Sequence, residues 1–324
     1  MRRKGIFYQF CICLVLCLCS SNTYAQLVLQ QLTELQGLGN NNVNDIHQDK
    51  KGFLWLGTDI GLTRYDGNFF HVYNFKKPNG EPIGITNIEE TEDRFLWLHC
   101  GDGSLGCFDK MRGEYIPIKQ GGTPSVEICN IYASGDTLYA MMSDGLKTLS
   151  IKSMTDSLEL DEKVLIQLKK RNMVLEGRNH ILYFIDNEKG LVIYDALSGK
   201  SLFVNDAQLG VKSHKIESIY PCGDYLFLGG RFQGIVCYNW KENKSRMIEI
   251  SNNQSDYNNL SINQVLYLGN NRFAISNVRF LYELSFEGSD FISSPFQVSK
   301  RVQSERQFER LIRNRISQLY FDKD

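Results

Sequence analysis

Short stretches of alternating apolar and polar residues recur along the chain, separated by turns rich in aspartate, asparagine and glycine. Alternation with a period of two is typical of β-strands, whereas helical repeats need a period of about 3.6 residues. The pattern therefore predicts an all-β protein. In the clearest unit the predicted strands span residues 43–48, 53–58, 62–65 and 69–73.

Two features of this unit indicate how its strands are joined and packed. Asp66-Gly67 is a strong signal for a tight hairpin, because the pair tolerates positive backbone φ angles. The strand at 53–58 is apolar on both faces, with residues 53 and 55 on one side and residues 54 and 56 on the other. A sheet that is covered on both sides by neighbouring sheets has this composition.

A repeat of about 42 residues emerges when the chain is compared with itself. A shift by one repeat places Trp55 on Trp97, a second shift places it on Tyr139, and later units align Phe184 and Phe227 with the same position. The repeat positions predicted to be structural are Trp55, Gly57, Gly61, Trp97, Gly103, Tyr139, Gly145, Phe184, Gly190, Phe227 and Gly234.

Six such units are present, the last a degenerate copy at 271–284. Repeats of this length with four strands each predict a β-propeller of about six four-stranded blades, which we expect over residues 26–324. Residues 158–168, between the third and fourth units, also suit a short helix, and the pattern leaves that alternative open.

The first unit carries a specific sequence pattern within residues 37–67. Its elements are GL at 37–38, NNV at 41–43, LWLGT at 54–58 and GLTRYDG at 61–67. This segment resembles the two-component regulator propeller repeat. Repeats of the WD type fit less well because Gly-His and Trp-Asp pairs are missing, and kelch repeats because Gly-Gly doublets fall at unequal positions.

The resemblance implies a periplasmic sensor domain of a hybrid two-component regulator. Such sensors respond to glycan fragments, so it implies a polyanionic or neutral oligosaccharide as ligand and a homodimer as the functional form. The kinase part of the family is not recognisable in this chain, so we expect no enzymatic activity, no catalytic residues and no cofactor. The residues that bind the ligand cannot be named from the pattern.

Two alternatives to the sensor remain open. An exported propeller lyase or glycosidase would place acidic, tyrosine or histidine side chains on the innermost strands, around the axis. We expect those strands to stay apolar, which favours the sensor. The other alternative is a non-functional remnant of a sensor. A formal net charge of −1 argues against a nucleic-acid partner, because phosphate binding needs a basic surface.

The N-terminus has the organisation of a signal peptide over residues 1–25. Three basic residues precede an apolar run at 10–19, and Thr23-Tyr24-Ala25 places small residues where signal peptidase cleaves. The run is too short to be a membrane anchor, and a leucine precedes each cysteine that could be acylated. We therefore expect export to the periplasm and no membrane span in the mature chain.

Other residues that could carry chemistry, such as the cysteines and histidines, are better explained by structural roles. The cysteines outside the signal segment are odd in number and match no disulfide or zinc pattern, which favours buried packing and leaves a bridge possible. We expect the repeated aromatic residues to pack between blades, the Asp-Gly pairs to form turns rather than calcium sites, and the histidines to bind no metal. The cysteines are Cys100, Cys107, Cys129, Cys222 and Cys237, and the histidines are His47, His71, His99, His180 and His214.

The last residues, 315–324, align with the first strand of the first unit, so that Ile316 matches Val43 and Asp322 matches Asp49. We therefore expect the chain to be a truncated sensor that stops inside a seventh blade. The basic stretch at 300–315 before it reads as a solvated connector, since acidic residues interrupt it.

Overall fold

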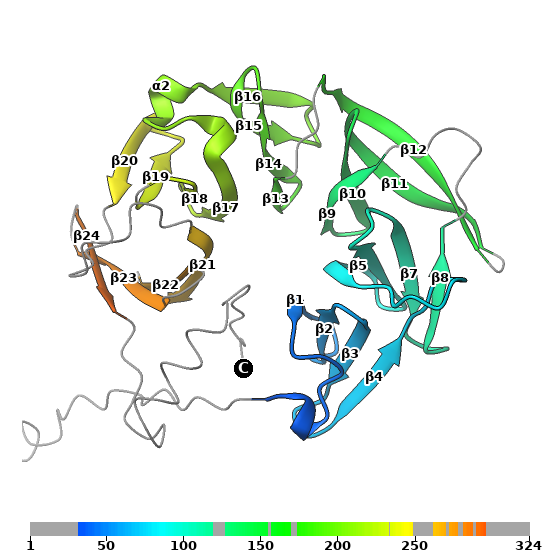
Figure 1. Ribbon diagram of the computed structural model, residues 1–324. Helices are drawn as coiled ribbons and strands as arrows, with labels where there is room; N and C mark the ends of the chain where they lie inside the picture. Colours follow the sequence, from blue (N-terminus) through cyan, green and yellow to red (C-terminus); the bar gives the residue numbers. More distant parts are fainter. Residues whose placement is uncertain are drawn as a thin grey trace, which may run out of the picture.

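A computed structural model describes residues 32–118, 127–154, 157–169, 174–232, 234–248, 262–269, 272–277, 281–287 and 290–295. Within them, strands form six four-stranded antiparallel sheets, each built from consecutive strands. The sheets are the blades of a six-bladed β-propeller, arranged around a central axis (Figure 1). The predicted all-β propeller fold is confirmed.

In blade 1 the strands agree with the bounds expected from the sequence to within one residue. Blades 2 and 3 have the same four-stranded arrangement. Blade 1 contains β1 (Val43–Gln48), β2 (Leu54–Thr58), β3 (Gly61–Tyr65) and β4 (Phe70–Asn74). Blade 2 contains β5 (Ile85–Glu92), β6 (Phe95–Cys100), β7 (Leu105–Asp109) and β8 (Glu114–Pro117). Blade 3 contains β9 (Ile128–Ser134), β10 (Thr137–Met142), β11 (Gly145–Met154) and β12 (Leu158–Gln167).

The second half of the ring repeats this arrangement. Blade 4 contains β13 (Leu175–Arg178), β14 (Ile181–Asp186), β15 (Gly190–Asp195) and β16 (Lys200–Val204). Blade 5 contains β17 (Ile216–Cys222), β18 (Tyr225–Gly230), β19 (Ile235–Asn239) and β20 (Lys244–Ile248). Blade 6 contains β21 (Ile262–Gly269), β22 (Arg272–Asn277), β23 (Leu281–Glu287) and β24 (Asp290–Pro295). Short helical turns occupy Glu34–Gln36, Asp206–Leu209 and Ser213–Lys215.

The hydrophobic core lies between the blades. The first strand of each blade is innermost (Figure 1). The second strands of blades 2 to 5 send alternate side chains to the two neighbouring blades. Trp55 is 2% exposed and packs with Leu96, Leu98 and Phe108 of blade 2. Corresponding clusters fill the interfaces between blades 2 and 3, 3 and 4, 4 and 5, and 5 and 6.

Trp97, Tyr139 and Phe227 occupy the position of Trp55, each buried against the next blade. Phe184 does not, and this part of the alignment is wrong. Phe184 packs back against blade 3, while its neighbour Tyr183 faces blade 5.

The physical reason is the turn that follows. Thr58 and Gly61 pair across a two-residue turn in blade 1, but Asp186 and Gly190 pair across three residues in blade 4. Counting backward from the glycine therefore selects the wrong face of the strand, because strand side chains alternate.

The repeated glycines separate into two kinds. Gly61, Gly145, Gly190 and Gly234 open the third strands with positive φ, and a Cβ atom would lie 2.1–2.3 Å from a carbonyl oxygen of the fourth strand. Only glycine fits such an approach. Gly103 instead lies in the turn before β7, where the nearest atom to a Cβ would be Glu127 Cγ at 3.0 Å. Gly57 lies on β2, against Ile85 of blade 2.

Residues 158–167 form strand β12 rather than a helix, which settles that alternative. The strand pairs with β11 along its length, and two register irregularities adjust the pairing. Lys147 of β11 is 6% exposed and forms ion pairs with Asp144 and Glu162. Cross-strand pairing thus overrides the local compatibility with a helix.

The cysteines form no disulfide in the described part of the chain, and the Asp-Gly aspartates Asp66 and Asp102 form turns. All five cysteines there are free thiols, and four are buried. Asp66 accepts hydrogen bonds from the backbone N–H groups of Asn68 and Phe69, and Asp102 accepts one from Ser104, as turn aspartates do. No group of three or more histidine, cysteine or acidic side chains in that part is arranged to hold a metal ion.

Three expectations fall on residues outside the described ranges. These are the signal peptide at 1–25, the basic stretch at 300–315 and the first strand of a seventh blade at 315–324. Within the described ranges, no helix is long and apolar enough to cross a bilayer.

Candidate ligand-binding site in the central channel

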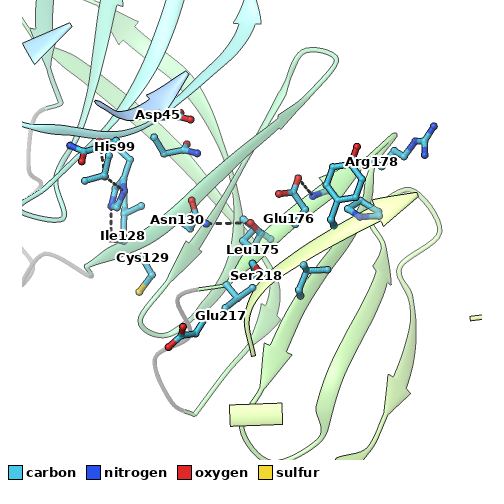
Figure 2. A pocket seen from close by; sticks show the side chains of 18 of the residues that line it. Asp45, His99, Ile128, Cys129, Asn130, Leu175, Glu176, Arg178, Glu217 and Ser218 are labelled. Carbon is cyan, nitrogen blue, oxygen red and sulfur yellow. Dashed lines mark hydrogen bonds between the residues drawn. The ribbon is translucent and has the colours of Figure 1, made fainter. Parts of the chain in front are cut away.

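A cavity of about 980 Å³ lies on the axis of the propeller. All six innermost strands contribute to its wall, and the view in Figure 2 shows side chains from blades 1 to 5 around it. A cavity of this size accommodates a small-molecule ligand.

The innermost strands place polar residues on this wall, so the expectation that they stay apolar is wrong. Asp45, Asn87, Asn130 and Ser218 each follow a register shift in their strand and line the cavity. A bulge re-aims the residue next to it and is common beside functional sites. The apolar residues that follow them, among them Ile88 and Ile131, pack between blades, which explains why the strands read as apolar.

Part of this polar set holds neighbouring blades together. Asp45 Oδ2 accepts a hydrogen bond of 2.5 Å from the backbone N–H of Ile88. Asn130 Nδ2 donates to the carbonyl of Leu175 at 3.2 Å, and His99 Nε2 lies 2.9 Å from the carbonyl oxygen of Ile128. Each contact joins one blade to the innermost strand of the next, so these side chains fix the width of the channel.

A second level of side chains on the innermost strands lies opposite the Trp55-type position of four blades, and two of its members, Glu176 and Tyr220, line the cavity. Glu89 pairs with Trp97, Tyr132 with Tyr139, Glu176 with Tyr183, and Tyr220 with Phe227. Two carboxyl groups and two phenols therefore occupy equivalent positions on four consecutive blades.

The two carboxyl groups of this level are hard to ionise. Burial raises the pKa of Glu176 to about 7, and the charge of Asp45 adds to the shift. Burial, Asp45 and Glu176 together raise the pKa of Glu89 well above its usual range, although the backbone N–H of Ala133 donates to it and opposes the shift. Among the described residues, no lysine or arginine forms an ion pair with either group.

The phenols complete the level. Burial raises the pKa of Tyr132 and of Tyr220, so both remain neutral donors. Tyr220 also accepts a hydrogen bond from the backbone N–H of Tyr267 at 3.1 Å. Neutral carboxyl, phenol and amide groups beside aromatic rings can both donate to and accept from hydroxyl groups.

Of the repeat positions predicted from sequence, only Gly103 lines the cavity, and the others lie between or within blades. The sequence reading missed Glu89, Glu176 and the bulge residues. The sequence did contain a signal for the bulge residues. In four innermost strands a polar residue directly precedes an isoleucine, in Asp45-Ile46, Asn87-Ile88, Asn130-Ile131 and Ser218-Ile219.

Comparison with known proteins agrees with the propeller fold described above. Residues 37–59 match the sequence profile of the two-component regulator propeller. A segment of 77 residues is 38% identical to Histidine kinase P4 of Formosa agariphila. This segment covers 22% of this chain and 5% of that protein.

Two solved structures share the fold over most of this chain. The extracellular domain of the putative hybrid two-component system BT4673 of B. thetaiotaomicron has a TM-score of 0.67 and 16% identity, over 92% of this chain and 40% of that one. The corresponding domain of BT3049 from the same organism has a TM-score of 0.59 and 18% identity, over 83% of this chain and 37% of that one.

This chain thus spans well under half the length of these relatives. The resemblance predicted from the first repeat is confirmed: residues 37–59 match the two-component regulator propeller, within a six-bladed ring whose fold is that of the extracellular domains of hybrid two-component systems.

Proposed function

We propose that the chain is the ligand-sensing propeller of a hybrid two-component regulator, exported to the periplasm, and that its central channel binds an oligosaccharide. The observation that carries the proposal is the match of residues 37–59 to the family profile, in the first blade of the ring. The channel supports it, since its wall combines hydrogen-bonding groups with aromatic side chains.

In this proposal the chain senses and does not catalyse. A ligand that bridges Glu89 of blade 2, Glu176 of blade 4 and Tyr220 of blade 5 would favour one spacing of the innermost strands. A ligand shifts a conformational equilibrium only by its differential affinity for the two states. The contacts between neighbouring innermost strands provide the route by which such a change spreads around the ring.

Isothermal titration calorimetry tests the binding step with a panel of maltotetraose, cellotetraose and mannotetraose. We expect at least one saturable heat, which Tyr220→Ala removes. Glu188→Gln, an exposed change in the β14–β15 turn, is the control and should leave it intact. Absence of heat from every glycan, with circular dichroism showing a folded chain, would contradict the proposal.

Export is tested separately by N-terminal sequencing of the chain recovered from the periplasm of its bacterial host. Cleavage before Gln26 is the expected result. A chain that stays in the cytoplasm, or keeps residues 1–25, would remove this part of the proposal.

A further inference from the structure

The charge on the channel wall is strongly unequal. Among the described lining residues, four are acidic, Asp45, Glu127, Glu176 and Glu217, and one, Arg178, carries a permanent positive charge. Glu89 is not part of this wall, but its carboxyl group lies close enough to interact electrostatically with Asp45 and Glu176, which are. The potential inside a narrow, poorly solvated channel is set by such an excess, because low-dielectric walls focus the field.

Arg178 does not neutralise the carboxyl groups of the second level. Arg178 is exposed, at the far end of β13, and Figure 2 shows its guanidinium pointing away from Glu176. Glu217 is paired with Arg231 at 2.8 Å, whereas Glu89 and Glu176 accept backbone hydrogen bonds from Ala133 and Gly177 and form no ion pair with a lysine or arginine among the described residues. Within the described part of the chain, these two carboxyl groups therefore lack a neutralising cation.

We infer that the channel admits uncharged oligosaccharides and rejects those bearing carboxylate or sulfate groups, with Glu89 and Glu176 as the residues that set this specificity. The inference rests on the proposed function for the ligand being a glycan. It narrows the expectation from the family resemblance, which allowed polyanionic ligands as well as neutral ones.

The physical argument holds whichever protonation state the two carboxyl groups have before binding. If they are ionised, an incoming anion meets like charges in a poorly solvated space. If the two carboxyl groups are protonated, the anion binds only while they remain protonated, so the affinity for the anion falls as the pH rises. A neutral sugar has neither cost, and its hydroxyl groups can donate to or accept from each carboxyl group.

A measurement that needs no sugar tests the electrostatic half of the inference. Ser218 lines the channel on β17, the strand next to the one that carries Glu176. Ser218→Cys would be treated with methanethiosulfonates bearing a sulfonate or a trimethylammonium group, and the modified cysteine identified by peptide mass spectrometry. The same thiolate attacks both reagents and displaces methanesulfinate from each, so the ratio of the two rates cancels the ionisation of the thiol.

Relative to a free thiol peptide, we expect the cationic reagent to be favoured by at least about tenfold at pH 8.5 and by less at pH 6. Adding Glu89→Gln and Glu176→Gln should abolish most of the preference, while adding Glu188→Gln should not change it. Equal rates of the two reagents at pH 8.5, or a preference that survives both glutamine substitutions, would overturn the inference.

The second arm compares each tetrasaccharide of the calorimetry panel with the same sugar oxidised at C6 to the uronate. The neutral form should bind about tenfold more tightly or better, and Glu89→Gln with Glu176→Gln should narrow the gap. Tighter binding of the uronate refutes the inference but leaves the sensor proposal standing. If no sugar binds, the sensor proposal fails, and the thiol measurement still decides the charge of the channel.

Discussion

Two adjacent glutamates on β5 have opposite surroundings. Glu90 points into the interface between blades 1 and 2, where Lys110 forms ion pairs with it and with Asp49. Burial opposes its ionisation, but nearby His47 and the Lys110 ammonium group lower the pKa of Glu90 to about 2. Glu89 instead lies near Asp45 and Glu176 of the channel wall, and burial together with these two carboxyl groups raises its pKa.

The difference shows how one strand serves two purposes. Successive side chains of β5 point to different sides, so a single residue step separates a structural ion cluster from the proposed binding surface. Between blades, buried charge is neutralised within the fold. Glu89 and Glu176, by contrast, form no ion pair with a lysine or arginine among the described residues. Substitutions on the two sides should therefore have different signatures.

The largest effect is expected on the interface side, for Trp55→Ala. Trp55 fills the interface between blades 1 and 2, and its Nε1–H donates to Asp49 Oδ2 at 2.9 Å. Removing a buried aromatic residue costs about 3–5 kcal/mol, so the free energy of unfolding in urea should fall by that amount. Trp240→Ala, at a site that is 38% exposed, is the control and should cost well under half as much. Similar losses for both would mean that Trp55 does not carry this interface.

Lys110→Met should come next. It leaves Asp49 and Glu90 buried without their cation, and breaking a buried ion pair from one side costs about 3 kcal/mol or more. Urea denaturation at pH 7 measures the loss of stability, which should shrink as the pH falls and protonation of Glu90 removes its buried charge. Lys169→Met removes an exposed pair with Glu188 and should change little. An unchanged stability of Lys110→Met would show that the cluster contributes nothing.

On the channel side, Glu176→Gln should stabilise the chain. Its folded pKa of about 7 lies above the unfolded value of 4.5, so its contribution to stability is complete below pH 4.5 and is lost as the pH rises through 7. The variant should gain up to about 3 kcal/mol over the parent at pH 8 and almost nothing at pH 4. Denaturation curves at the two pH values provide the comparison. A gain of the same size at both would show that ionisation is not the cause.

The smallest effect is expected for Asn130→Ala, which removes the hydrogen bond to the carbonyl of Leu175 but changes no charge. The loss should be about 1 kcal/mol and independent of pH between 4 and 8. Hydrogen exchange of the β9 and β13 amides should increase locally. If exchange increases equally in all blades, Asn130 does not act as a local tie between blades 3 and 4.

The sequence predicted the architecture well because each repeat contains its own strand and turn signals. It failed where the answer depends on how blades meet. The side to which Phe184 points depends on a turn that is one residue longer than in blade 1. The polarity of the channel depends on bulges that alternation alone does not show. Glu89 and Glu176 look like ordinary surface residues in the sequence, and only the arrangement of blades 2 to 4 around the axis brings them close enough to interact.

The placement of the hydrophobic clusters has a further consequence. Every cluster joins the front of one blade to the back of the next, and each of the five spans two blades. Each blade therefore behaves like a monomer in a head-to-tail polymer, whose single type of joint is used again at every step. Such a joint accepts any subunit with a matching front and back, so whole blades can be gained by duplication without redesigning their neighbours. Within a blade, by contrast, a one-residue insertion such as that before Gly190 must be accommodated in the turn where it occurs. If it shifted the strand instead, each side chain of that strand would face the opposite neighbouring blade.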